Sequence, residues 1–168
     1  MRWMKAFLAG ILGAFLITII LAAVIYGGGF RVTDFSMMWG TIVGLPVGAA
    51  AWWVGFCIHL LVGGLFGLCY AGLFQAFSGA GVFRGSLFGI GHAILTGVVI
   101  GFVPLIDTAM ETGRMLASRP YFSREGVGGI LLYFFIHVIF GATVGWLYAR
   151  QVPAAREVTE TRDYHIAA

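Results

Sequence analysis

The feature that most restricts the fold is a long stretch without charge: residues 35–83 contain no Asp, Glu, Lys or Arg. As a single α-helix this stretch would be about 70 Å long, whereas the hydrocarbon core of a bilayer is roughly 30 Å thick. It therefore has to be divided. Three other apolar segments, at about 5–26, 84–107 and 126–149, are each long enough to span a bilayer.

The composition is typical of an integral membrane protein. Hydrophobic residues make up 60% of the sequence and charged residues only 10%, and there are 26 glycines. Glycine is costly in a soluble helix but is expected in membrane helices, where it lets two backbones approach closely. The net charge of +3 forms no basic stripe, so nucleic acid is excluded as a partner and the lipid bilayer is expected instead.

An internal repeat divides the uncharged stretch. A shift of 78 residues places 48–71 over 126–149, and a shift of 79 places 5–16 over 84–95. The matches of the longer segment include a histidine and a tyrosine: Gly48/Gly126, Phe56/Phe134, Ile58/Ile136, His59/His137, Gly63/Gly141, Gly67/Gly145, Tyr70/Tyr148 and Ala71/Ala149. The repeat unit is predicted to be a helical hairpin. Two hairpins inserted in the same sense would be related by a pseudo-two-fold axis along the membrane normal.

The sequence thus predicts an all-α integral membrane protein with four transmembrane helices, arranged as two tandem hairpins with a period of about 78 residues. Residues 1–150 would form one domain, with the first hairpin at about 5–77 and the second at about 84–149. Residues 35–46 align with the polar segment 113–124 and are predicted to be interfacial or re-entrant; five spans are the alternative. The polar tail 151–168 is predicted to be disordered.

The distribution of Lys and Arg favours cytoplasmic termini. With that orientation the inside carries Arg2, Lys5, Arg84, Arg150, Arg156 and Arg162, and the outside carries Arg31, Arg114, Arg119 and Arg124. The repeated pattern H-x3-G-x3-G-x2-Y resembles helices of small bacterial membrane proteins, which implies a multi-pass protein of a bacterial-type inner membrane.

Two histidines within the spans are the candidate functional residues. On a helix, His59 shares its face with Gly55 and Gly63, and His137 shares its face with Gly141. In one interpretation these glycines allow close helix packing, and each histidine forms a hydrogen bond across the interface to a carbonyl, a hydroxyl or its repeat mate. In the other, the bare faces make room for a tetrapyrrole such as haem b, whose iron His59 and His137 would bind as axial ligands.

A third histidine in the spans, His92, has no histidine counterpart in the repeat and is a weaker candidate for the same site. The sequence predicts that it is neutral and bonded to Thr96 or another neighbour. The spans contain no Asp or Glu, so a bare metal ion is not expected.

No nucleophile–base pair or phosphate-binding loop is visible, so no enzymatic activity is expected. The first functional hypothesis is a non-catalytic accessory or assembly subunit of a larger inner-membrane complex. It would associate with other membrane subunits, or with itself, through glycine-rich helix faces. The alternative is an electron-transfer membrane protein that binds haem b or another tetrapyrrole.

Overall fold

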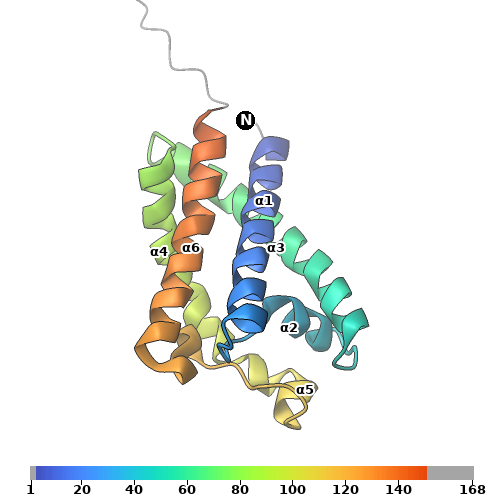
Figure 1. The fold of residues 1–168 in the computed structure, drawn as a ribbon. Coiled ribbons are helices and arrows are strands. Elements are labelled where there is room, and N and C mark those ends of the chain that lie inside the picture. Colours follow the sequence, from blue (N-terminus) through green and yellow to red (C-terminus); the bar gives the residue numbers. More distant parts are fainter. Residues whose placement is uncertain (1–2, 151–168) are drawn as a thin grey trace, which may run out of the picture.

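The computed structural model describes residues 3–150, and these residues form helices joined by short connections (Figure 1). Four helices are long and apolar enough to cross a membrane: α1 (Trp3–Ala22), α3 (Ala49–Ala76), α4 (Val82–Ile100) and α6 (Gly126–Ala149). The prediction of four spans is confirmed. The five-span alternative is wrong, because the segment before α3 forms only the eight-residue helix α2 (Phe35–Ile42), which is too short to cross.

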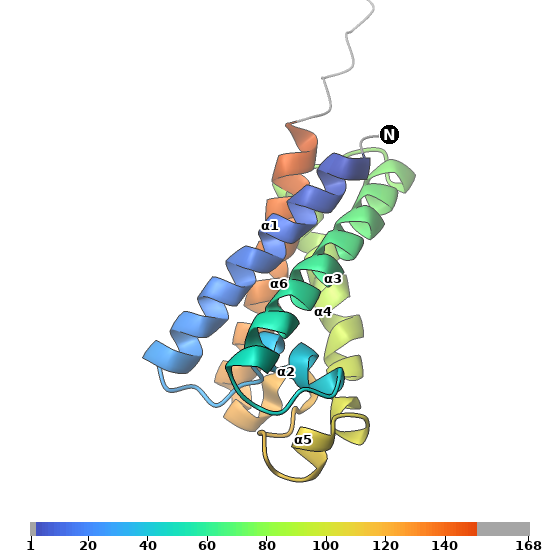
Figure 2. The same cartoon turned by 90° about the vertical axis from the view of Figure 1, so that its right-hand side faces the viewer.

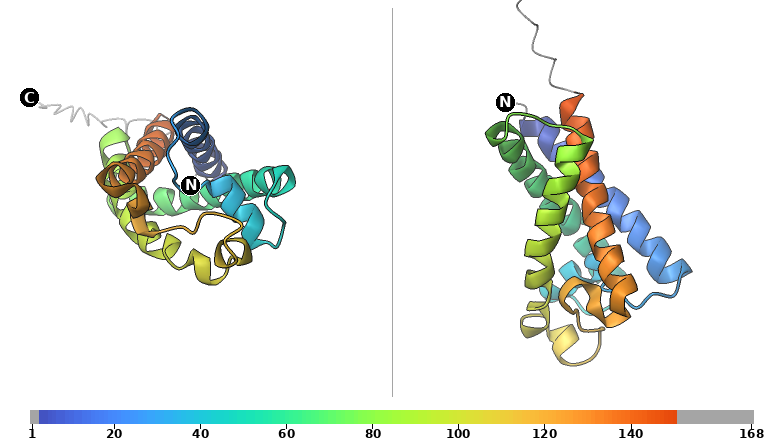
Figure 3. Two further views of the ribbon diagram at one scale, coloured as in Figure 1. Left: turned by 60° about the horizontal axis from the view of Figure 1, so that its bottom comes forward. Right: turned by 90° about the vertical axis from the view of Figure 1, so that its left-hand side faces the viewer.

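The two ends of the helix bundle differ, because short helices cover one of them. The start of α1 and the end of α6 lie at one end, whereas α2 and α5 (Thr108–Glu111) lie at the other (Figures 1 and 2). α1 continues into a π-helical turn, η1 (Ala23–Gly27), before the chain turns towards α2. Between α4 and α6 the chain forms the short helical turns η2 (Val103–Leu105) and η3 (Pro120–Glu125) and crosses the end of the bundle (Figure 3). The tail 151–168 lies outside the described residues.

Glycines determine which helices touch closely. A Cβ atom at Gly63 of α3 would overlap the side chain of Ala14 on α1, and one at Gly10 of α1 would overlap the backbone of Gly63. On the other side of the bundle, a Cβ at Gly141 of α6 would meet the backbone of Gly85 on α4. α1 therefore packs on α3, and α4 packs on α6, at distances that only small residues permit.

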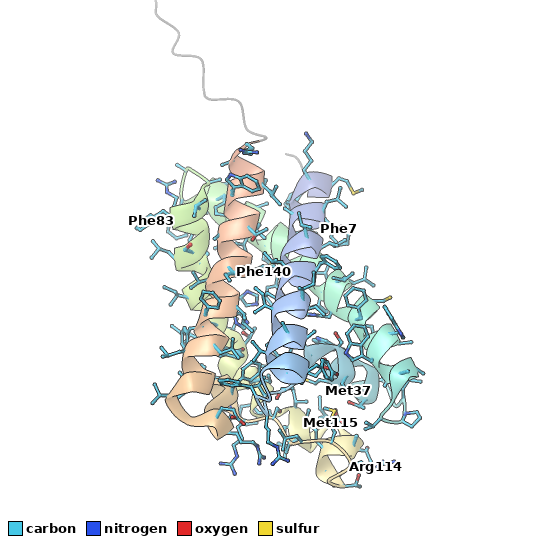
Figure 4. The ribbon with its side chains drawn as sticks, in the orientation of Figure 1. Phe7, Met37, Phe83, Arg114, Met115 and Phe140 are labelled. Atoms are coloured by element: carbon cyan, nitrogen blue, oxygen red, sulfur yellow. The ribbon has the colours of Figure 1, made fainter. Side chains whose placement is uncertain are left out.

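The side chains are distributed as expected for a protein surrounded by lipid. Large apolar side chains face outward on every span, including Phe83, which points away from α4 (Figure 4). The interior contains Phe140, which lies between α6 and α1, together with the buried polar residues His59 and His137. The polar groups of the spans therefore lie inside the bundle, where they find hydrogen-bond partners.

Two aspartates fix the short helices at the end of the bundle opposite the start of α1 and the end of α6. Asp34 caps α2 by accepting from Met37 N, and it also accepts from the Tyr26 hydroxyl at 2.8 Å and from Trp52 Nε1 at 3.0 Å. One carboxylate thus joins the end of the first span, α2 and α3. Because it satisfies three donors at once, it holds α2 against the bundle.

Asp107 has the same role for α5 and is completely buried. Its carboxylate accepts from Ala109 N and Met110 N, which caps the helix, and from the Thr41 hydroxyl of α2 at 2.6 Å. The bond to Thr41 ties α5 to α2. The segment 35–46 is consequently an integral part of the bundle's end.

A left-handed turn closes the same end over α4 and α6. Tyr121 and Phe122 both have φ near +57°, a conformation that is uncommon outside glycine. The turn directs the ring of Phe122 inward against Phe35 and Tyr133, whereas the Tyr121 hydroxyl donates to Ile94 O of α4 at 3.2 Å. These contacts on both sides maintain the backbone conformation.

Candidate functional site: a cavity lined by three histidines

A cavity of about 240 Å³ lies inside the bundle, towards the end that α2 and α5 cover. His59 of α3, His92 of α4 and His137 of α6 all line it, and α1 contributes Ala14 and Ile17. The remaining wall is mostly apolar and rich in aromatic rings: Phe35, Trp39, Phe66, Tyr133 and Phe140. The structure therefore brings together all three histidines that the sequence singled out within the spans.

Each of the two repeat-related histidines is anchored by a threonine of the neighbouring helix. His59 Nδ1 lies 3.0 Å from Thr18 Oγ1 of α1, and His137 Nε2 lies 3.2 Å from Thr96 Oγ1 of α4. In both pairs the threonine precedes the histidine by 41 residues and also donates to the carbonyl four residues before it. Thr18 and Thr96, like the two histidines, are 78 positions apart.

His137 and Thr96 belong to a larger polar group. His137 Nδ1 lies 2.8 Å from the carbonyl oxygen of Tyr133, one turn earlier on α6. The Tyr133 hydroxyl donates to Thr96 Oγ1 at 2.8 Å. Three side chains from two helices thus share one hydroxyl, which fixes the orientation of the His137 ring.

Of the two partners that the sequence left open for His92, Thr96 or another neighbour, the ring faces another neighbour. Thr96 donates to the backbone carbonyl of His92, whereas the ring Nδ1 of His92 lies 3.4 Å from the Tyr70 hydroxyl of α3. The threonine lies one helical turn after His92, so its hydroxyl reaches the carbonyl more easily than the ring. The imidazole packs on the ring of Phe66, with centroids 3.9 Å apart, and edge-on against His137 at 5.0 Å.

Of the three glycines predicted to border a cofactor, only Gly63 lines the cavity. Gly55 is covered by α2, where a Cβ would overlap the backbone of Ser36, and Gly141 is covered by α4. Those two positions provide close helix contacts, which corresponds to the packing interpretation of the glycine faces.

Sequence reasoning did not identify Thr18 as a partner of His59. The signal was present, because the same 78-residue shift that aligns the histidines also aligns Thr18 with Thr96. It was hidden because the first helices were aligned at a shift of 79 over residues 5–16, which stops before the threonine. Asp107 was also missed, since a loop carboxylate gives no sign in the sequence that it will be buried.

Within residues 3–150, no group of three or more His, Cys, Asp or Glu side chains is arranged to hold a metal ion. The three imidazoles share a cavity but do not converge on one point. The part of the chain that the structure describes thus offers hydrogen-bonding nitrogens on an aromatic wall, which suits an uncharged ligand better than a bare cation.

Fold and site together define a multi-pass helical membrane protein with an internal cavity lined by histidines. No protein-family model matches the chain, and neither a curated protein nor a solved structure shows significant similarity to it.

Proposed function

We propose that this chain is a non-catalytic accessory subunit of a larger inner-membrane complex and that it holds a small molecule in its three-histidine cavity. The observation that carries the proposal is the cavity itself, because ionisable side chains inside a membrane bundle are costly and are candidates for a functional site. Three imidazoles from three helices share its wall. Sites for small ligands have this composition, with a largely apolar lining and a few oriented polar groups.

Blocking the cavity tests whether it binds a ligand. Val99 lines the cavity and is half-exposed, whereas its neighbour Val98 is similarly exposed and does not line it. We expect the Val99→Trp variant, purified in mild detergent, to lose a small molecule that native mass spectrometry detects on the wild type. Val98→Trp should retain it. Equal loss from both variants, or no bound molecule on the wild type, would contradict the proposal.

Association with partner subunits needs a separate test. We expect chemical crosslinking in membranes, followed by purification, to yield one or more additional membrane proteins or a second copy of the chain. A chain that stays monomeric and uncrosslinked would remove the basis for the subunit role.

Haem b is the second candidate ligand, and one observation favours it. A histidine that binds a metal usually donates its other ring N–H to a carbonyl or hydroxyl. The Nδ1 atoms of His59 and His137 both have such partners, which would leave Nε2 of His59 for an axial bond to iron, whereas Nε2 of His137 already lies 3.2 Å from Thr96 Oγ1.

The space around the histidines argues against haem. The cavity measures about 240 Å³, below the roughly 300–1,000 Å³ typical of sites for larger ligands. His92 also packs edge-on against the His137 ring, with ring centroids 5.0 Å apart, and Phe140 packs against His92. The residues as arranged do not fit a tetrapyrrole.

A visible spectrum of the purified protein decides the question of haem. We expect no Soret band. A band that disappears in the His59→Ala/His137→Ala double variant would establish the haem alternative instead.

We further propose that the chain is an internal duplication of a helical hairpin. The α1–α3 and α4–α6 contacts support it, because the two helices of each pair meet through glycines. Gly10 of α1 lies against Gly63 of α3, and Gly85 of α4 lies against Gly141 of α6. The two threonine–histidine pairs support it independently, since threonine, histidine and their spacing are all repeated.

A further inference from the structure

The chemical class of the ligand follows from which ring nitrogens carry protons, and His137 gives the clearest case. Its Nδ1 lies 2.8 Å from a carbonyl oxygen, which can only accept, so Nδ1 carries the hydrogen. In the neutral imidazole Nε2 is then an acceptor. That atom lies 3.2 Å from Thr96 Oγ1, but the single hydrogen of this hydroxyl is donated to His92 O, so Thr96 donates no hydrogen bond to it.

His59 has the same tautomer, but its Nδ1, and not the acceptor Nε2, faces the threonine. The single hydroxyl hydrogen of Thr18 is donated to Ala14 O at 3.0 Å, so Thr18 Oγ1 accepts from His59 Nδ1–H. Nε2 of His59 therefore carries a lone pair, and no hydrogen bond to it is formed within residues 3–150.

This free acceptor is directed into the cavity. The His59 side chain is only 8% exposed, yet in the described part of the chain Ser36 Oγ is the sole fully enclosed side-chain polar atom that lacks a partner. Nε2 of His59 has no partner there and is not among the fully enclosed atoms, so part of its surface is accessible. The space that His59 borders is the cavity. A buried acceptor left unpaired costs about 1–3 kcal/mol, so a ligand that donates a hydrogen bond is favoured there.

The remaining wall specifies the body of the ligand. Phe35, Phe66, Phe140 and Trp39 present aromatic surface, which pairs well with another flat ring. A cavity of roughly 150 Å³ is known to hold benzene, so about 240 Å³ accommodates a substituted ring.

Access is from the lipid. Val99 and Ile106 both line the cavity and are 56% and 69% exposed, on the apolar outer surface of the bundle. They lie on the side where α3 and α4 touch only slightly. A ligand reaching His59 by this route travels through hydrocarbon.

Building on the function proposed above, we propose that the cavity binds a lipid-soluble phenol or hydroquinone, whose ring packs among the aromatic side chains and whose hydroxyl donates to His59 Nε2. An oxidised quinone, which has no hydroxyl, leaves this acceptor unpaired. The hydrogen bond to His59 therefore favours the hydroxyl-bearing form.

Three matched probes test this inference: para-hexylphenol, para-hexylanisole and hexylbenzene. They share the ring and the tail, but only the phenol donates a hydrogen bond. Binding is measured by equilibrium dialysis of the full chain in nanodiscs against empty nanodiscs of the same lipid. We expect the phenol to bind between about threefold and tenfold more tightly than the anisole, as one net hydrogen bond predicts.

The variant His59→Phe keeps an aromatic ring but removes the acceptor, and it should reduce binding of the phenol to the level of the anisole. Leu61→Phe, two residues away on the lipid-facing side of α3, is the control and should change nothing. If no probe binds above the empty nanodiscs, the proposed cavity function fails. If all three bind alike, or if His59→Phe weakens hexylbenzene as much as the phenol, only the phenol inference fails. The comparison of probes on the wild type stands even if the variant does not fold.

Discussion

Thr18 and Thr96 each place a hydroxyl between an imidazole and the backbone of their own helix. A threonine in a membrane helix commonly satisfies its hydroxyl on the carbonyl one turn earlier, which leaves the oxygen free to accept. That free lone pair is what orients His59. The threonine hydroxyl thus donates within its own helix, and by accepting it orients a histidine on the neighbouring helix.

If the hairpins are duplicated, the two threonine–histidine pairs should have similar coupling energies. We expect double-mutant cycles of Thr18→Val with His59→Phe, and of Thr96→Val with His137→Phe, each to give about 1 kcal/mol, as for other hydrogen bonds between membrane helices. Thr96→Val alone should cost more than Thr18→Val, because the Tyr133 hydroxyl also loses its acceptor. Reversible unfolding in mixed detergent and SDS micelles measures all of these. Coupling in only one pair would contradict a duplicated role.

At the scale of elements, the paired helices are in closest contact at glycine positions, where there is no room for a larger side chain. Gly63 and Gly141 lie against the neighbouring backbone or methyl group, whereas Gly72 of α3 and Gly91 of α4 have no atom near the position of a Cβ. The same residue type therefore serves two purposes along these helices. Only the structure separates glycines that pack from glycines that face lipid.

Substitution by leucine should separate the two groups of glycines. We expect Gly63→Leu and Gly141→Leu each to lower the free energy of unfolding by about 2 kcal/mol or more, because overpacking forces the helices apart. Gly72→Leu and Gly91→Leu should change it by less than about 0.5 kcal/mol, as surface substitutions usually do. Thermal or SDS unfolding of the four variants provides the comparison. A large loss at Gly72 or Gly91 would show that those faces are covered.

For the whole molecule, the even number of spans places the start of α1 and the end of α6 at the same end of the bundle (Figure 1). Which side of the membrane this end faces is a prediction from the Lys and Arg distribution, and single cysteines can test it. In a Cys57→Ala/Cys69→Ala background, we expect an impermeant maleimide to label Thr112→Cys in intact cells. Ser78→Cys, in the loop between α3 and α4, should be labelled only after lysis. The reverse pattern would invert the orientation.

How much could be predicted from the sequence depends on the physical origin of each feature. The spans were predictable because a bilayer imposes a length and a polarity, and α6 spans the predicted residues 126–149. That the segment before α3 does not span followed from the repeat, which aligns residues 35–46 with the polar segment 113–124. The location of His92 in the same cavity as His59 and His137 was not predictable, because the relative depth and rotation of helices depend on glycine contacts formed in three dimensions.

The length of α3 has a consequence for the bilayer itself. Its 28 residues give a helix of roughly 42 Å, longer than the roughly 30 Å hydrocarbon core, and α3 runs obliquely across the bundle (Figures 1 and 2). Helices that exceed the membrane thickness are accommodated by tilting. α3 forms one side of the gap that faces α4, so its inclination sets the width of that gap. Acyl-chain length thus acts on a wall of the cavity, because a thicker membrane favours a more upright α3 and a thinner one a more inclined α3.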